Sequence, residues 1–283
     1  MLGILKLQQT QYVYGMVIGT IAIIENPKTD HRITDSLHAT IKHLRTHTSS
    51  WFWIRGLAIF VIHDFISDAA LPALFPAFCT NNAFGQRVRD MVIATLLVNW
   101  QATWVHMVIT KSSPKHLYQR LLDWNIWIQV LPITFLDALG RWAAFTLSIN
   151  LELLLLDAMG TGDITHSLSV PGKSPRVVLV GLVPRLMKYL VSTITRIVFV
   201  RIAASMLDGD DESIVPLDPS LRNTHRRMGI ADAWGSADRA FRARVWKIEG
   251  RAFVLGAGIT LLGTVASPSL GELLFLPPLW FDV

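Results

Sequence analysis

Cysteine and charged side chains are both scarce in this chain. Its 283 residues include one cysteine, Cys79, and only 17% of them are charged. A lone cysteine cannot form an internal disulfide, which excludes a disulfide-stapled secreted scaffold. Soluble domains usually carry about a quarter charged residues. The apolar share of 51% also excludes intrinsic disorder, and the composition is not that of a collagen-like repeat.

Sequence motifs for nucleotide, metal and nucleic-acid chemistry are missing as well. The chain has no P-loop, no GxGxxG, no HExxH and no GxSxG elbow. It also shows no RRM, zinc-finger or helix-turn-helix signature. The net charge of +5 therefore predicts basic loops that face anionic lipid headgroups, and not a nucleic-acid partner. The expected partners are the lipid bilayer and a lipophilic small-molecule substrate.

Long apolar runs are what the chain does have, with a mean hydropathy of +0.40. A membrane-spanning helix needs about 20 mostly apolar residues. The first run lacks the features of a signal peptide and is counted as a span. The sequence predicts an all-α polytopic transmembrane bundle of six to seven spans in a single integral membrane domain, 1–283. The apolar runs are 7–24, 51–75, 90–109, 124–159, 176–205 and 252–275.

The run 124–159 decides the span count, because its 36 residues are too many for one ordinary crossing. If it crosses once, alternate loops carry 15 Lys and Arg residues on one side against 3 on the other. This asymmetry fits the positive-inside tendency. The charges therefore favour one crossing plus an interfacial or re-entrant half-helix, and a seven-span bundle with two crossings is the alternative.

The polar stretch 206–251 is predicted to be a cytosolic loop between the last two spans. From Ile230 a helical pattern returns, with Arg239, Arg242 and Lys247 away from its apolar face. Two interpretations stay open: an amphipathic helix lying on the membrane surface, or a helix packed on the other cytosolic loops. The apolar face consists of Trp234, Ala237, Phe241, Val245 and Ile248.

Acidic residues at membrane depth are the candidate catalytic groups. Because burying them is costly, their presence there indicates a function. Asp64 and Asp68 are four residues apart, on one helix face beside Ser67. Two carboxylates this close disfavour double ionisation, so one can keep its proton and act as a general acid. The alternative is that Asp68 lies solvated at the membrane edge. Glu152 is the reserve acid.

The run 90–109 carries the candidate substrate-binding residues. Asn99, Thr103 and His106 form a polar stripe, and Trp100 and Trp104 lie on the adjacent stripe. A polar stripe beside an aromatic stripe suits a cavity for a lipophilic substrate, but polar residues also join membrane helices by hydrogen bonds. In the next run, the pair Asp137 and Arg141 is predicted to be a structural salt bridge.

No metal or other cofactor is predicted. His63 with Asp64 and Asp68 is the one cluster that suggests a divalent ion, whereas enzymes that bind diphosphates with magnesium typically use two acidic clusters. The stretch 208–211 matches the Asp-x-Asp-Asp motif of soluble protonating cyclases. It lies in a hydrophilic loop, where an acid lacks a dry pocket, so the match is interpreted as chance.

Several stretches resemble a group of fungal multipass membrane proteins, most of them uncharacterised. These are 100–106 (WQATWVH), 112–115 (SSPK), 118–120 (YQR), 210–218 (DDESIVPLD) and 232–234 (DAW). The resemblance would cover most of the chain from about Trp51 onward, but its motifs name no chemistry.

In size, span count and buried acids the chain is also similar to the membrane-bound terpene cyclases of fungal meroterpenoid clusters. This resemblance implies a protonation-initiated cyclase of a secondary-metabolite pathway, which protonates an epoxide or olefin so that the prenyl chain folds into rings. Asp64 or Asp68 would be the proton donor, without a cofactor. A scaffold or transport accessory and a membrane acyltransferase, with His63 or His106 as its histidine, are the alternatives. The expected location is the endoplasmic reticulum.

Overall fold

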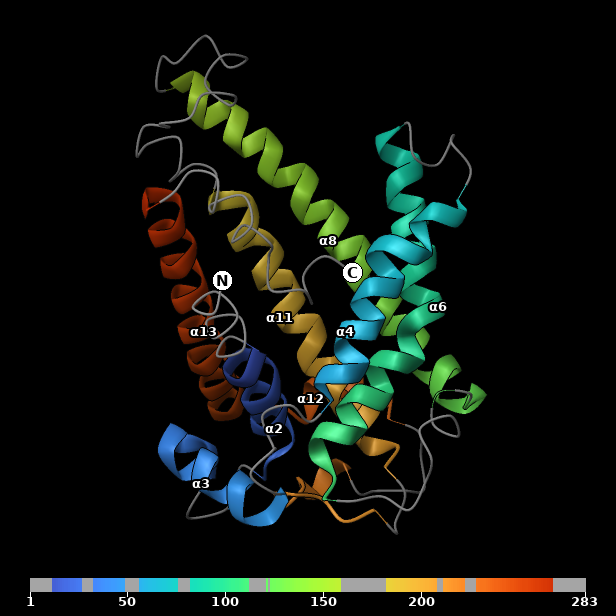
Figure 1. Cartoon of the computed structure of the whole chain (residues 1–283), viewed down its shortest axis with the longest axis vertical. Coiled ribbons are helices and arrows are strands. Elements are labelled where there is room, and N and C mark those ends of the chain that lie inside the picture. Colours follow the sequence, from blue (N-terminus) through green and yellow to red (C-terminus); the bar gives the residue numbers. More distant parts are fainter. Residues whose placement is uncertain are drawn as a thin grey trace.

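The computed structural model describes residues 12–26, 33–48, 56–75, 82–111, 121, 123–158, 182–207, 211–221 and 228–266. These residues form helices and contain no β-strand, only two isolated β-bridges. The all-α prediction is confirmed for this part of the chain (Figure 1). The longer elements are η1 (Tyr12–Ile18), α2 (Gly19–Ile24), α3 (Leu37–Thr48), α4 (Leu57–Phe65), α6 (Ala83–Ile109), α8 (Trp124–Ala158), α11 (Leu182–Ser205), α12 (Ile230–Gly235) and α13 (Arg239–Ala266).

Three helical segments of the described chain are long and apolar enough to cross a membrane. They are Leu57–Leu74, Phe84–Ile109 and Trp124–Leu151. The first of them begins with α4 and continues through the π-helix η4 (Ile66–Ala70) and the short 3-10 helix η5 (Pro72–Leu74). The apolar runs 51–75, 90–109 and 124–159 of the sequence thus correspond to helices of membrane-spanning character.

The long apolar run after residue 123 forms one helix, α8, of 35 residues. At about 1.5 Å per residue it measures about 50 Å, well beyond the roughly 30 Å of a bilayer's apolar core. Figure 1 shows α8 inclined across the bundle and reaching past the end of α11. Inclination is how a long helix fits a bilayer. Two crossings within 124–158 are therefore wrong, and so is a separate half-helix there.

Helices α6, α8 and α11 form the packed unit that positions the candidate site. α8 packs most extensively against α11, and α6 packs on both. The helices α8 and α11 approach closely at Gly140 of α8, where a Cβ atom would lie 2.8 Å from Cγ1 of Val191. A larger residue at this position would force a local shift of the contact.

The N-terminal helix is interior rather than lipid-facing. Tyr12–Ile18 is a π-helix that continues as α2, and Ile21, Ile23 and Ile24 of α2 are completely buried. Figure 1 places α2 among the other helices, with α13 on one side and α4 on the other. The expectation of a lipid-crossing span at 7–24 is therefore not met by 12–24, because its residues pack against protein on all sides.

The predicted amphipathic helix packs on the bundle. It is divided into α12 and α13 by a turn at 236–238, where Oδ1 of Asp238 accepts a hydrogen bond from the backbone N–H of Phe241. Ala237, Phe241, Val245 and Ile248 are buried, so the apolar face was predicted correctly. This face contacts the protein core, which contradicts a helix lying on the membrane surface. The helix is packed, but on the helices α2, η1 and α11 and not on the cytosolic loops.

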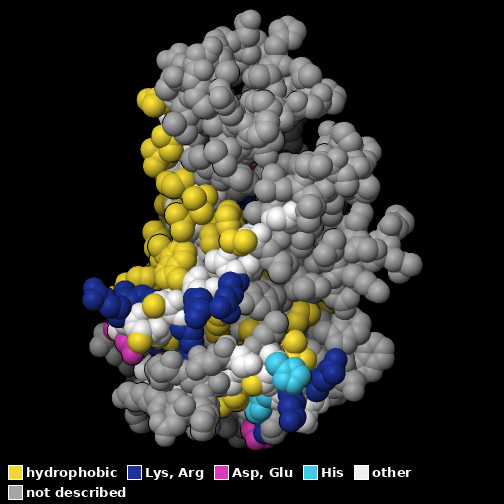
Figure 2. All heavy atoms as spheres, turned by 90° about the vertical axis from the view of Figure 1, so that its left-hand side faces the viewer, with side chains coloured by type: hydrophobic (Ala, Val, Ile, Leu, Met, Phe, Trp, Pro, Cys, Tyr) yellow, Lys and Arg dark blue, Asp and Glu magenta, His cyan; other side chains and the backbone are white. Residues whose placement is uncertain are grey.

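The segment 211–221 closes one end of the bundle. The backbone N–H of Ile214 donates to the carbonyl of Ile109, and that of Asp218 donates to Ile24, so the segment covers the ends of α6 and α2. Helix α3 lies at the same end (Figure 1). Figure 2 shows Lys, Arg and His side chains low on the face with α3 and α13, below hydrophobic side chains. This change of surface chemistry is typical of a membrane interface.

Candidate functional site

The predicted acids of α4 lie in different surroundings. Asp64 is half-buried and Asp68 is exposed. The helix changes to the π-helix η4 at Ile66, between the two aspartates, so the α-helical spacing that placed them on one face does not hold. Ser67 donates a 3.1 Å hydrogen bond to the Asp68 carboxylate. Of the two interpretations, the structure favours Asp68 at an exposed edge over Asp68 in a dry pocket.

The neighbouring His63 is buried, and its Nε2 has no hydrogen-bond partner among the described residues. The third predicted acid, Glu152, belongs to α8, but its side chain lies outside the described part of the structure. Its predicted catalytic role remains a prediction.

The polar stripe of α6 joins helices. The side-chain amide of Asn99 donates to the carbonyls of Leu121 and Asp123 at 3.1 and 3.2 Å. Nε2 of His106 lies 2.7 Å from the carbonyl of Ala203 in α11. Both residues are buried, and these bonds tie α6 to the segment before α8 and to α11. Structural partners thus explain both residues, while a role in substrate binding stays a prediction.

The aromatic stripe is also part of the core. Nε1 of Trp104 donates a 3.0 Å hydrogen bond to the hydroxyl of Tyr12, and Trp100 packs against the core as a partly buried residue. A Cβ atom at Gly56 would lie 2.9 Å from Nε1 of Trp104. Gly56 also has a φ of +77°, which glycine adopts far more readily than other residues. The backbone before α4 therefore fits tightly over the Trp104 indole.

A small pocket does lie between α6, α8 and α11, with a cavity volume of about 40 Å³. Its polar centre is the ion pair of Asp137 and Arg141, 2.9 Å apart. Thr195 of α11 donates a short hydrogen bond to the same carboxylate. Thr134, Gln101 and Arg196 add polar groups, and Ile133 and Phe199 supply apolar wall. We call this the Asp137 pocket.

The Asp137 pocket lies beside a candidate membrane span. Asp137 is inside the candidate span Trp124–Leu151, and its neighbours Phe135 and Leu136 point outward with exposures of 44% and 48%. Burying charged side chains within a span is costly, and their pairing offsets only part of that cost. Such residues therefore commonly serve a function. The sequence predicted the Asp137–Arg141 salt bridge correctly, but it did not show that α11 would complete a pocket around it.

Three further ion pairs hold the interior together, and sequence reasoning missed them. Arg196 pairs with Glu249, Arg201 with Asp218, and Arg244 with Glu25. Each of the six side chains is at most 9% exposed. The only available signal was the presence of arginines inside the apolar run 176–205.

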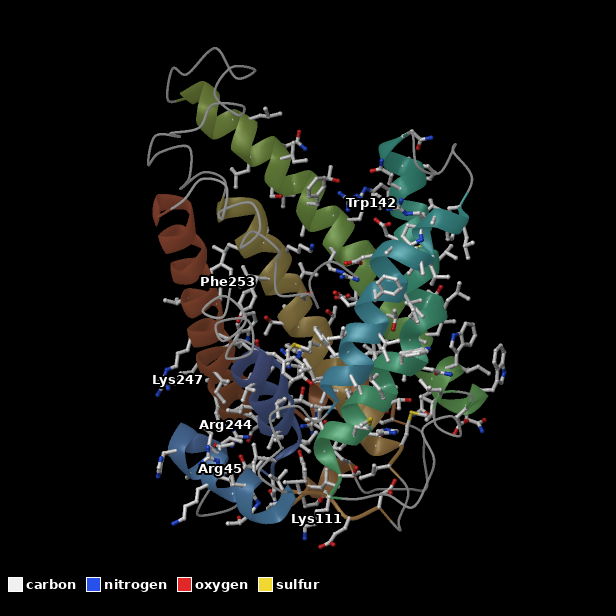
Figure 3. All side chains as sticks on the ribbon, in the orientation of Figure 1. Arg45, Lys111, Trp142, Arg244, Lys247 and Phe253 are labelled. Carbon is white, nitrogen blue, oxygen red and sulfur yellow. The ribbon has the colours of Figure 1, made fainter. Side chains whose placement is uncertain are left out.

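Each of these arginines also binds the backbone of the N-terminal helix. Arg196 donates to the carbonyls of Gly15 and Met16, Arg201 to Ile23, and Arg244 to Ala22. The last carbonyls of a helix have no partner within it and carry partial negative charge. Arg244 and Arg201 supply donors for two such carbonyls, those of Ala22 and Ile23, whereas Arg196 binds carbonyls within η1. We call Arg196, Arg201 and Arg244 the arginine clamps; Figure 3 labels Arg244 at the lower end of α13.

In the part of the chain that the structure describes, no group of three His, Cys, Asp or Glu side chains could hold a metal ion. This includes His63, Asp64 and Asp68. Of the acidic stretch 208–212, Asp211 and Glu212 belong to the described residues.

Comparison with known proteins finds no matching family model, and no curated protein or solved structure gives a significant match.

Proposed function

We propose that this chain is an intramembrane enzyme that acts on a lipophilic, prenylated substrate bound in the Asp137 pocket. The observation that carries the proposal is a carboxylate, a guanidinium and a threonine hydroxyl gathered in a pocket beside a candidate span. The pocket combines apolar wall with a few convergent polar groups, as small-molecule sites do, and its cavity of about 40 Å³ admits only the end of a prenyl chain. A prenyl chain can reach such a pocket directly from the bilayer.

Protonation-initiated cyclisation is the finer form of the proposal. The Asp137 carboxylate and the Phe199 ring both line the pocket, and both can stabilise positive charge that develops along a prenyl chain. Proton donation is assigned to Asp64 or Asp68 from the sequence; neither lines the Asp137 pocket. The reaction uses no cofactor.

The membrane setting belongs to the same proposal. Helices α11 and α13 have 24 and 28 residues, which at about 1.5 Å each is enough to cross an apolar core of roughly 30 Å. In Figure 1, α11 runs beside α8, and α13 stands at the left edge of the view beside α2. Together with the three candidate spans, α11 and α13 would form a multipass bundle of five spans, placed in the endoplasmic reticulum.

The test is turnover by the full chain in native-like membranes, with prenylated aromatic compounds that carry a terminal epoxide. Cyclisation conserves mass, so the product is an isomer with a changed chromatographic retention. Asp137→Asn should lower turnover by about 100-fold, the effect of losing one well-placed electrostatic group. Glu212→Gln, a change of a side chain that is 72% exposed, is the matched control and should be silent.

Asp64→Asn and Asp68→Asn identify the proton donor in the same assay. Loss of product in only one of them assigns the acid. Unchanged turnover in Asp137→Asn, with normal expression and thermal unfolding, would contradict the Asp137 pocket as the active site. Unchanged turnover in the Asp64→Asn/Asp68→Asn double variant would contradict their catalytic role.

A non-catalytic membrane scaffold is the second candidate function, and one observation favours it. Glu25, Asp137, Asp218 and Glu249 all pair with arginines, as a purely structural role requires. This function predicts no turnover of any substrate in the panel and no bound small molecule in the purified protein.

A further inference from the structure

Helix α13 carries basic side chains that no carboxylate compensates. Arg239, Lys247 and Arg251 are exposed, and they form no ion pair within the part of the chain that the structure describes. The only acidic residue in the sequence of α13 is Glu249, which is buried and paired with Arg196. The outer surface of this helix is therefore positively charged.

Two of these cations flank an open place on the helix surface. Lys247, Gly250, Arg251 and Val254 follow one another at helical spacing along the outer face of α13. A Cβ atom at Gly250 would have no described atom within 4 Å, apart from its own helix backbone and its chain neighbours. Figure 3 shows Lys247 projecting outward from α13, below Phe253. We call the four residues 247, 250, 251 and 254 the Lys247 face.

The charged part of α13 ends at the Lys247 face. The remainder of the helix, 252–266, contains no charged residue, and Val254 is 69% exposed. Figure 2 shows hydrophobic side chains above the Lys and Arg side chains on this side of the molecule. Trp246 lies half-buried next to Lys247, and tryptophan is enriched where a protein crosses from lipid to water. The Lys247 face therefore lies at the change from charged to apolar surface.

The exposed carboxylates that precede α13 lie too far along the chain to neutralise the Lys247 face. Asp232 belongs to α12, and Asp238 accepts a hydrogen bond from the backbone N–H of Phe241 at the start of α13. Lys247 lies about 14 Å further along the helix axis than Asp238, at about 1.5 Å per residue. Salt screens exposed charges over roughly 8 Å at physiological ionic strength. The two cations of the Lys247 face thus act as uncompensated charges.

We propose that the Lys247 face binds the headgroup of an anionic phospholipid of the bilayer. The headgroup lies over Gly250 and accepts hydrogen bonds from Lys247 and Arg251, while an acyl chain follows Val254. Guanidinium and ammonium groups form hydrogen bonds to phosphate that are about twice as strong as neutral ones. Basic residues beside a membrane-spanning segment attract anionic lipids. The lipid is a structural ligand, so this inference goes beyond the proposed function and does not depend on it.

The experiment measures lipid binding by the full chain purified in a neutral detergent. Phosphatidylserine and phosphatidylcholine both contain a phosphate, but only phosphatidylserine has a net negative charge. Each is titrated, and native mass spectrometry measures the bound fraction. Because each basic residue near an anionic surface strengthens binding about fivefold, phosphatidylserine should bind about 20-fold more tightly. Lys247→Gln/Arg251→Gln should remove this preference.

Two controls separate the Lys247 face from net charge alone. Lys42→Gln/Arg45→Gln changes the net charge equally, by removing two exposed cations of α3 that also form no ion pair among the described residues. The preference for phosphatidylserine should then stay within twofold of wild type. Lys247→Arg/Arg251→Lys keeps both charges and should keep the preference as well.

Gly250→Leu covers the case in which the double glutamine variant does not fold. The new side chain fits the open place at Gly250 and leaves every charge intact, but it occupies the position of the headgroup. It should weaken phosphatidylserine binding at least about fivefold, the contribution of one basic residue. An unchanged preference in this variant, with normal thermal unfolding, would overturn the proposal.

Two further outcomes would also overturn it. One is equal affinity of the wild-type chain for the two lipids, or an equal loss of preference in the α3 control. The other is displacement of phosphatidylserine by an equal concentration of glycerol 3-phosphate, which has a phosphate but no acyl chain. That result would assign the Lys247 face to a soluble anion, whereas the absence of displacement supports a membrane lipid.

Discussion

Asp218 is a buried residue whose charge the fold maintains. Burial alone would raise the pKa of its carboxyl, but hydrogen bonds from Arg201 and Ser220 outweigh that effect and lower it below the ordinary value. Arg201, itself completely buried, donates to this carboxylate at 2.8 Å. A residue whose pKa is lower in the folded state than in the unfolded chain stabilises the fold at neutral pH. That stabilisation is lost as the pH falls through the folded pKa.

We therefore expect acid to weaken the fold through Asp218. Asp218→Asn should reduce stability at pH 7 by about 3 kcal/mol, because it leaves Arg201 buried without a counter-ion. It should also flatten the fall of the Tm below about pH 5. Thermal unfolding in detergent between neutral and acidic pH checks both effects. In Glu212→Gln, whose exposed pair with Lys111 contributes little, the acid dependence should match wild type. An unchanged acid slope in Asp218→Asn would refute this assignment.

At the residue scale the sequence predicts which side chains share a face but not what they contact. The stripe of Asn99 and His106 was derived correctly from helical periodicity. Their partners, the carbonyls of Leu121 and Ala203, are backbone atoms that any residue type supplies. The paired state of Glu25 was equally hidden, because Arg244 is 219 residues away in the chain. The relative position of Asp64 and Asp68 was predicted wrongly, because the sequence around them does not indicate a π-helix.

At the scale of elements, the pair of Arg196 and Glu249 joins η1, α11 and α13. Arg196 binds Glu249 at 2.9 Å and also the hydroxyl of Thr20 at 3.1 Å. No Cβ atom fits at Gly19, because it would lie 2.7 Å from Oε1 of Glu249. The three elements therefore meet around one charged contact, and the stability of each depends on the other two.

A double-mutant cycle should reveal this dependence. Arg196→Met leaves Glu249 buried and unpaired and should cost about 3 to 5 kcal/mol. Adding Glu249→Leu removes the unpaired charge and should restore much of that loss, so the two effects are far from additive. Thermal unfolding of the two single variants and the double variant supplies the cycle. Additive losses would mean that the ion pair does not couple the helices.

Helices as elements were the most predictable level, and their surroundings the least. The apolar runs at 90–109 and 124–159 have the length and hydropathy of spans, and both are helices. By contrast, 7–24 is equally apolar, yet its described part is interior. Hydropathy cannot distinguish a lipid-facing helix from a helix in the protein interior, because both environments favour apolar side chains. For the same reason the sequence left open whether 230–251 lies on the membrane or packs on protein. The burial of Phe241 and Val245 shows that it packs on protein.

At the scale of the whole molecule, the distribution of basic residues predicts the orientation in the membrane. Arg45, Lys111, Arg244 and Lys247 lie toward the end closed by 211–221 and α3, and Trp142 lies toward the other end. In a Cys79→Ala background, cysteines at Lys247 and at Gln86 should react with an impermeant maleimide from opposite sides of sealed vesicles. Lys247→Cys should react from the cytosolic side. Labelling of both positions from one side would contradict a crossing by α6.

The all-helical class followed from composition, but the position of the Asp137 pocket did not. Scarcity of charge predicted an all-helical membrane protein, because a bilayer admits few other architectures, and the described residues are helical with three helices long and apolar enough to span a membrane. The Asp137 pocket requires α6, α8 and α11 to converge, and no local pattern encodes which of several apolar helices become neighbours. The candidate acids named from the sequence therefore differ from the carboxylate around which the described helices form a pocket.

The arginine clamps also have a consequence for biosynthesis. Arg196, Arg201 and Arg244, which donate to carbonyls of the helix 12–24, lie some 180 to 220 residues later in the chain. During translation this helix is therefore made long before these three donors. We expect it to reach its final packing only after the start of α13 has been made, because a chain that stops before Arg244 lacks one of them.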